Sequence, residues 1–192
     1  MLKRLCFPLF AILLLAGCAA PNNTLSLEPK ITLPAQNQAQ GTHSISITSV
    51  DNRSSKSLAE INRDGKLVQL IPSREPRYLL QEAVEKQMSA RGFTVSSPAN
   101  INLVIQLNSL NANVQEGSLR HNITAQTSVT IDAQAPNGAK TTRTFNRNYN
   151  EQGPMGASNA KIESAINTAL TDIIADMAND QDLSQFIKQN SN

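Results

Sequence analysis

The chain has 192 residues, of which 40% are hydrophobic, 17% charged and 4% aromatic, and it contains no tryptophan. Its formal net charge is +2 at pH 7, and the two cations nearest the N-terminus, Lys3 and Arg4, account for that excess. Without these two residues the formal charge is zero, so the rest of the chain has no electrostatic attraction for nucleic acid, and so few aromatic side chains argue against a stacking platform for bases. Nucleic-acid binding is therefore excluded.

The N-terminal residues have the pattern of an export signal that ends in a lipidation site. The two cations are followed by an apolar run over 5–15, which is too short to span a bilayer as a helix. The next stretch, Leu15-Ala16-Gly17-Cys18, resembles the bacterial lipobox, in which the cysteine accepts a diacylglyceryl group through its thiolate. We therefore expect residues 1–17 to be a signal peptide, and Cys18 to carry S-diacylglycerol and N-palmitoyl groups.

A lipid on Cys18 would hold the protein on a membrane without any transmembrane helix. One acyl chain binds reversibly, whereas two or more anchor stably, at about 0.8 kcal/mol per buried methylene. Ala19 and Ala20 resemble the residues found after the cysteine in lipoproteins that are passed to the outer membrane. Cys6 leaves with the signal peptide, so the mature chain retains no thiol for a disulfide, a zinc site or a nucleophile.

The segment 18–41 has the composition of a flexible tether, because it carries three prolines and few apolar residues. As a random coil it would span on the order of 25 to 30 Å. Within it, Lys30-Ile31-Thr32-Leu33 alternates and could add a short edge strand before Pro34. Residues 42–192 are then expected to form a single periplasmic domain, which is long enough for one hydrophobic core.

Strand patterns open this domain. Alternating apolar residues predict a strand over 43–50, and the polar cluster 51–55 follows it. This cluster is either a turn, which is the interpretation we favour, or a site at a strand end. Two apolar runs, 58–61 and 67–71, flank Asp64-Gly65, a pair typical of a tight hairpin turn.

A helix is predicted over 76–91, with proline in its first turn and Gly92 after its end. Three long alternating segments follow, joined by two short polar turns: 101–114, 123–133 and 141–151. They predict an antiparallel meander, with a bulge near Ser109 where the alternation changes phase. The polar face of this meander is rich in Asn, Gln, Thr and Ser.

The longest helical pattern begins after Ser158, a good capping residue. Its apolar stripe is broad enough to lie across a sheet, and pairing with a partner's helix is the alternative. A last short helix, beginning at Asp180 or Asp182, would dock on the domain or face a partner. The fold expected is α+β: a two-layer sandwich in which an antiparallel sheet (N-terminal strand, hairpin and meander) is covered by two main helices.

Residues able to perform catalysis or bind metal form no motif that we can identify. His43 and His121 belong to no spaced metal motif, and Ser158 lacks the flanking pattern of a nucleophile elbow. We therefore expect no catalytic residue, metal or cofactor. An enzyme would need a cleft that gathers His121 with a carboxylate such as Asp132 or Glu116.

Several segments carry a family resemblance: the lipobox, Lys30-Ile31-Thr32-Leu33-Pro34, Leu79-Leu80-Gln81-Glu82, Lys86-Gln87-Met88-Ser89-Ala90-Arg91-Gly92, Leu170-Thr171-Asp172 and Phe186-Ile187-Lys188-Gln189-Asn190. Over essentially its full length the chain resembles the YajG family of uncharacterised enterobacterial (Gram-negative) lipoproteins. The resemblance implies an outer-membrane lipoprotein that faces the periplasm, and it brings no catalytic motif.

Two functions remain open. The first is a non-enzymatic adaptor that binds an envelope protein or a peptidoglycan-related partner through a sheet edge or the polar sheet face. The second is a carrier that holds a small apolar ligand or lipid between the helices and the sheet. A carrier would need a cavity lined by core residues such as Leu103, Ile105, Ile166 and Ile173.

Replacing Cys18 by alanine is expected to leave the protein unlipidated, either soluble or retained as a precursor, because alanine has no thiolate to accept the lipid. Cell fractionation and intact mass spectrometry measure both properties, with Cys6→Ala as a control expected to be lipidated normally. If the Cys18→Ala protein were found as firmly in the outer-membrane fraction as the parent, the anchor prediction would be wrong.

Overall fold

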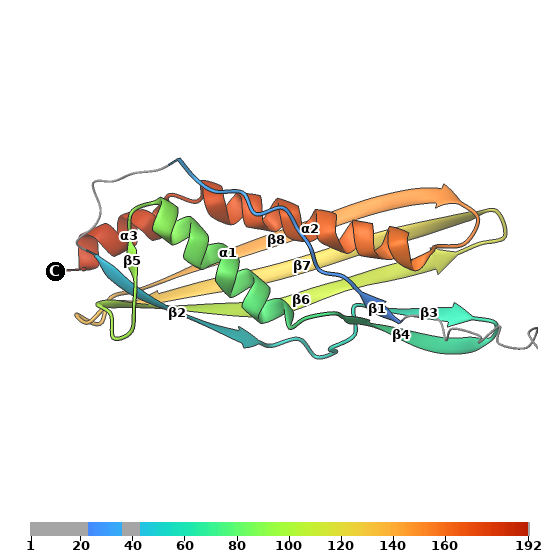
Figure 1. The fold of residues 1–192 in the computed structure, drawn as a ribbon, viewed down its shortest axis with the longest axis horizontal. Helices are drawn as coiled ribbons and strands as arrows, with labels where there is room; N and C mark the ends of the chain where they lie inside the picture. Colours follow the sequence, from blue (N-terminus) through green and yellow to red (C-terminus); the bar gives the residue numbers. More distant parts are fainter. Residues whose placement is uncertain (1–22, 36–42, 192) are drawn as a thin grey trace, which may run out of the picture.

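The computed structural model describes residues 23–35 and 43–191, and the structural statements below concern these residues. It contains eight strands and three helices, arranged as an elongated molecule in which the helices lie along a curled sheet (Figure 1). The elements in chain order are β1 (Thr24–Leu25), β2 (Ser44–Asp51), β3 (Ala59–Arg63), β4 (Lys66–Pro72), α1 (Pro76–Ala90), β5 (Thr94–Val95), β6 (Ile101–Glu116), β7 (Arg120–Gln134), β8 (Lys140–Pro154), α2 (Asn159–Asn179) and α3 (Asp182–Asn190).

Strand β6 is the centre of the sheet. One of its edges pairs with β7, which in turn pairs with β8, and both pairings are antiparallel. The predicted meander is therefore confirmed, and the register shift between Leu107 and Ser109 confirms the predicted bulge. The other edge of β6 is shared, because β2 pairs with it along 101–107 and β3 meets it only at Ala112.

Apart from the β3–β4 hairpin, the prediction of an antiparallel sheet is wrong for the N-terminal half of the domain. There β2 runs parallel to both β5 and β6, β3 runs parallel to β6, and β1 runs parallel to β4. The connection from β2 to β6 passes through a hairpin and helix α1, and such crossovers return the chain in the same direction. Alternation of apolar residues shows which face of a strand is buried. It does not show whether the neighbouring strand runs parallel or antiparallel to it.

The β3–β4 hairpin forms at the predicted place. Its register pairs Arg63 with Lys66, so Asp64 and Gly65 are the two turn residues, with φ of 50° and 79°. Both angles lie in the left-handed region that a two-residue primed turn requires. This turn projects the hairpin beyond the point where β3 meets β6 (Figure 1).

The core lies between one face of the sheet and the helices. Helix α1 contacts β2 and β6, and helix α2 contacts β6, β7 and β8. The predicted stripe of α2 is buried, and its members are Ile162, Ala165, Ile166, Ala169, Leu170, Ile173, Ile174, Met177 and Ala178. None of the helices in the described ranges is long and apolar enough to cross a membrane.

Helix α3 docks on the domain, which answers the question that the sequence left open. Its residues Leu183 and Ile187 are buried. Arg91, also buried, follows α1 and donates to the carbonyls of Met177 (3.2 Å) and Ala178 (2.7 Å), and to Ser184 Oγ at 2.7 Å. A cation at the C-terminal carbonyls of a helix is favourable, so Arg91 joins α1, α2 and α3.

The opposite face of the sheet carries polar side chains that bond one another across the strands. Asn52 donates to Gln106, which donates to Asp132, and Thr142 also donates to that carboxylate. A second row joins Asn108, Thr130 and Thr144. Such cross-strand pairs stabilise the sheet and already use much of the hydrogen-bonding capacity of this face.

The described part of the predicted tether, residues 23–35, packs on the domain, so the prediction of flexibility is wrong there. We call this segment the strap. Its strand is β1, beside β4, and not the alternating segment 30–33. Leu25 and Leu27 are 0% and 1% exposed. Burying two leucines contributes roughly 1.5–3 kcal/mol each, which offsets part of the entropy cost of ordering the segment.

A ladder of hydrogen bonds fixes the strap along α2. The amides of Ser26, Glu28 and Lys30 donate to side chains of α2 that are spaced by four residues: Glu163 (2.7 Å), Asn167 (2.8 Å) and Thr171 (3.1 Å). Two residues of extended chain rise about 6.6 Å and four residues of helix rise about 6 Å, so the two spacings match. Further along, Gln87 of α1 donates to the Thr32 carbonyl at 3.0 Å.

Replacing Ile173 by aspartate is expected to unfold the domain, because Ile173 is 0% exposed and an unpaired buried carboxylate costs several kcal/mol. Ile173→Leu, which keeps the volume, should cost less than about 1.5 kcal/mol. Circular dichroism during thermal unfolding compares the two. An aspartate variant that kept the melting temperature of the parent would show that the stripe is not core.

Candidate functional site

A break in the sheet beside β6 forms a concavity on the surface of the domain. Strand β2 pairs with β6 as far as Leu107, and β3 joins it only at Ala112. Among the described strands, none therefore pairs with residues 108–111 on this edge. The connection from β2 to β3 bends over the break and encloses an open cleft of about 550 Å³, which we call the β2–β3 cleft.

Half of the residues that line the β2–β3 cleft are serine or asparagine. One side is the β2–β3 connection with the start of β3, and the other is the bulged part of β6. The lining residues are Arg53, Ser54, Ser55, Ser57, Leu58, Ala59, Glu60, Asn108, Ser109, Leu110, Asn111, Ala112, Asn113 and Val114. Serine and asparagine side chains both donate and accept hydrogen bonds, so this surface can match a partner of mixed polarity.

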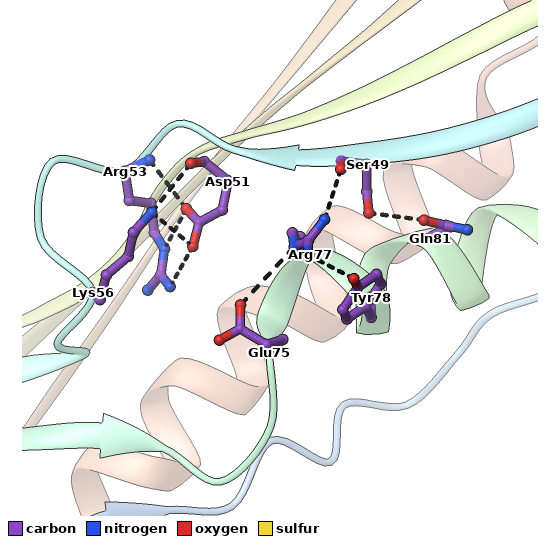
Figure 2. Close-up of polar contacts among 8 residues, drawn as sticks. All are labelled: Ser49, Asp51, Arg53, Lys56, Glu75, Arg77, Tyr78 and Gln81. Carbon is purple, nitrogen blue, oxygen red and sulfur yellow. Dashed lines mark hydrogen bonds and ion pairs between the residues drawn. The ribbon is translucent and has the colours of Figure 1, made fainter.

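A buried ion cluster supports the rim of the cleft. Arg53 donates through Nε (3.0 Å) and Nη2 (2.9 Å) to the Asp51 carboxylate, and Lys56 Nζ lies 3.1 Å from the same carboxylate (Figure 2). The Arg53 side chain is 4% exposed and that of Asp51 is 8%. Arg53 Nη1 has no hydrogen-bond partner within the described ranges.

Burial alone would raise the pKa of Asp51, but hydrogen bonds from Arg53 and Lys56 outweigh it and lower that pKa from 3.8 to about 2. The carboxylate is therefore ionised at every physiological pH. It neutralises one of the two cations beside it, so the cluster keeps one net positive charge. Lys56, whose side chain is 62% exposed, presents that charge to solvent.

A second polar group joins β2 to the start of α1. Arg77 donates to the Ser49 carbonyl (3.2 Å) and to the Tyr78 hydroxyl (2.6 Å), and its guanidinium lies 4.0 Å from the centre of the Tyr78 ring. Ser49 Oγ donates to Gln81 at 2.8 Å (Figure 2). These contacts fix α1 to the strand that ends at the cleft and leave Tyr78 53% exposed.

The structure does not gather the residues that an enzyme would have needed. His121 is buried and its Nδ1 bonds the Met155 carbonyl at 2.8 Å, while Glu116 accepts from the Ala157 amide at 2.7 Å. Both therefore hold the loop before α2. Asp132 lies far along β7, on the polar face. Within the described ranges, no group of three metal-ligating side chains is close enough to hold an ion.

The lipidation residues Leu15, Ala16, Gly17 and Cys18 lie outside the described residues. The residues proposed to line a carrier cavity, Leu103, Ile105, Ile166 and Ile173, lie within the continuous core and are 0–1% exposed. Three surface cavities, of about 550, 460 and 300 Å³, are lined by other residues. This packing does not favour a carrier.

Sequence reasoning pointed to the cleft only through the polar cluster 51–55, which it interpreted as a turn. The turn is present, because Asp51 Oδ1 accepts from the Arg53 amide at 3.1 Å. The same residues also line or support the cleft. The wall formed by β6 was not predicted, because the break in the sheet at 108–111 depends on which strands pair with β6.

Comparison with known proteins decides the family. Residues 29–188 match the model of a family described as "Uncharacterized lipoprotein". The chain belongs to this family. It is also 44% identical, over 191 residues and 100% of both chains, to proteins named "Uncharacterized lipoprotein YajG" from Escherichia coli K12 and O6:H1. The family resemblance found in the sequence is thus confirmed.

A solved structure from Xanthomonas campestris shares the fold. It superposes with a TM-score of 0.56 at 14% sequence identity, covering 86% of this chain and 96% of that chain. At this identity the likeness concerns the fold alone. It agrees with a mixed α+β architecture and a partly parallel, curled sheet.

Replacing Asp51 by asparagine is expected to destabilise the domain at pH 7 by roughly 2 kcal/mol, because the pKa of this carboxyl is about 2 in the folded protein instead of 3.8. Because the folded pKa lies below the unfolded one, this stabilisation is present above about pH 4 and disappears as the pH falls through 2. Urea unfolding of both proteins at pH 7 and pH 2 measures the difference.

Glu82→Gln is the matched control for that experiment. Glu82 pairs with Lys86 at 2.6 Å, but both side chains are about half exposed, so the pair contributes little. Equal losses for the two variants at pH 7 would mean that the buried cluster has no special role in stability.

Proposed function

We propose that this protein is a lipoprotein held on the outer membrane by a lipid on Cys18, with a periplasmic domain that binds a partner and performs no catalysis. Membership of a lipoprotein family supports the anchor, and so does the sequence Leu15-Ala16-Gly17-Cys18. Ala19 and Ala20 support the outer membrane as the destination.

The observation that carries the binding role is the β2–β3 cleft. It is open and lined by side chains that donate and accept hydrogen bonds, and its wall on β6 includes residues 108–111, which have no partner strand on that side among the described strands. An extended segment of a partner protein can use such an edge for main-chain bonds and the neighbouring side chains for specificity.

The charges around the cleft fit a partner that is polar and close to neutral. Arg53 is paired with Asp51, and the formal charges of exposed Lys56 on the rim and of Glu60 in the lining are opposite, so these four side chains sum to zero. The polar face of the sheet is a weaker candidate, because many of its side chains already bond one another. A partner bound there would have to replace those bonds.

Site-specific photo-crosslinking in intact cells tests this proposal. A benzoylphenylalanine placed at Ser55, an exposed residue of the cleft, is expected to capture a defined envelope protein, identified by mass spectrometry. The same group at Ser89, exposed at the end of α1, is the matched control. Capture of the same proteins at equal yield from both positions would contradict the proposal.

A variant that fills the cleft sharpens the test. Asn111→Trp places a large ring in the cleft wall and should abolish the crosslink at position 55. Asn146→Trp, on the exposed face of β8, should leave that crosslink unchanged. Circular dichroism confirms that both variants fold.

A further inference from the structure

The most exposed apolar side chains gather at one end of the molecule. Among the large apolar residues with exposed side chains in the described ranges, Leu119 (82%), Met155 (76%) and Leu67 (69%) are the three most exposed. They lie on the β6–β7 turn, on the loop between β8 and α2, and beside the β3–β4 turn. Figure 1 shows these three connections at the end opposite the C-terminus.

Hydrogen bonds link the connections at that end of the molecule to one another and to neighbouring elements. The Met155 amide donates to the Leu119 carbonyl at 3.0 Å. Arg63, at the end of β3, donates to Asn159 at the start of α2. We call the surface formed by Leu67, Leu119, Met155 and their neighbours the apical surface.

Met155 has a backbone conformation that is unfavourable for its side chain. Its φ is 61°, in the left-handed region where glycine is the ordinary choice. The backbone is fixed from both sides, because the amide bonds Leu119 and the carbonyl bonds His121. A strained conformation that holds a methionine in solvent is most simply explained if that side chain has a use there.

The chain enters the domain from the side of the apical surface. In the parallel pairing of β1 with β4, Thr24 lies opposite Ile71 and Leu25 opposite Pro72. The N-terminal end of β1 therefore points toward the β3–β4 turn. The Asn23 carbonyl accepts from the Ile71 amide at 2.9 Å, so the strap is bonded to β4 from its first described residue.

The length of chain before this point limits the distance to an anchor. Cys18 is five residues before Asn23, and five residues span at most about 18 Å. From Ile71 to the β3–β4 turn, strand β4 covers six residues, or about 20 Å. A lipid on Cys18 can therefore reach a bilayer no further away than about the level of that turn.

We infer that the apical surface rests on the lipid bilayer, with Leu67, Leu119 and Met155 in the headgroup region; this rests on the lipid anchor proposed above. Lys66 precedes Leu67 and Arg120 follows Leu119, and both are exposed. Apolar side chains next to cations are suited to an interface with acyl chains below and anionic headgroups around them.

The test uses the full lipoprotein, reconstituted in vesicles of phosphatidylethanolamine and phosphatidylglycerol. The two cysteines of the chain are Cys6 in the signal and the acylated Cys18. The variant Ser118→Cys would therefore give the mature protein a free thiol at that position. An environment-sensitive fluorophore is attached to this thiol. Gln189→Cys, exposed on α3 at the opposite end, is the matched control.

At position 118 the emission should shift to the blue and be quenched by spin-labelled lipid, whereas at position 189 neither change is expected. Leu119→Asp with Met155→Asp should remove the quenching at 118. Met155→Gly, which relieves the backbone strain, should weaken it without lowering stability. Vesicle flotation is measured in each case.

The possible results test the membrane anchor and the apical contact separately. Protein that floats with the vesicles but gives the same emission at 118 as at 189 would overturn the contact and leave the anchor intact. Protein that does not float would overturn the anchor and, with it, the contact. Quenching at 118 that survives both aspartate substitutions would show that these apolar side chains do not make the contact.

Discussion

Burial of the apolar stripe of α2 is the interaction on which most of the structure depends. One side of the helix packs on β6, β7 and β8, where it covers the predicted meander. Its flank provides Glu163, Asn167 and Thr171 to the strap, and its last carbonyls accept from Arg91. Each large buried side chain contributes roughly 1.5–3 kcal/mol. Sheet, strap, α1 and α3 are thus all positioned against one helix.

The strap shows how a polar segment becomes ordered when its surroundings fit. Its composition predicts a flexible tether, and only two leucines enter the core. The decisive feature is geometric, because side chains spaced by four on α2 meet amides spaced by two on the strap. The sequence of the strap alone, or of α2 alone, does not reveal this match in spacing. Ordering the strap leaves only residues 19–22 between Asn23 and the cysteine proposed to carry the lipid.

Local patterns predicted the elements well, because each rests on the physics of neighbouring residues. The Asp64-Gly65 turn, the bulge near Ser109 and the Ser158 cap are all present, and the cap accepts from the Lys161 amide at 3.4 Å. Pairing between distant segments was not predictable in this way. Strand direction beside β6, the break at 108–111 and the docking of the strap depend on which surfaces meet after the crossover through α1. The sequence therefore predicted the turn at 51–55 but not the β2–β3 cleft beside it.

If Cys18 carries a lipid, the short connection to Asn23 limits which partners the proposed binding cleft could meet. A flexible coil over 18–41 would let the domain sample positions well away from the bilayer. With the strap fixed, the five residues from Cys18 to Asn23 would span at most about 18 Å, so a lipid on Cys18 would keep the domain beside the membrane. The proposed anchor and the proposed apical contact would together hold the β2–β3 cleft in a fixed zone above the bilayer. A soluble periplasmic partner gains little from such an arrangement, whereas a partner itself embedded in the membrane, with a segment emerging at that height, meets the cleft with a small entropy cost.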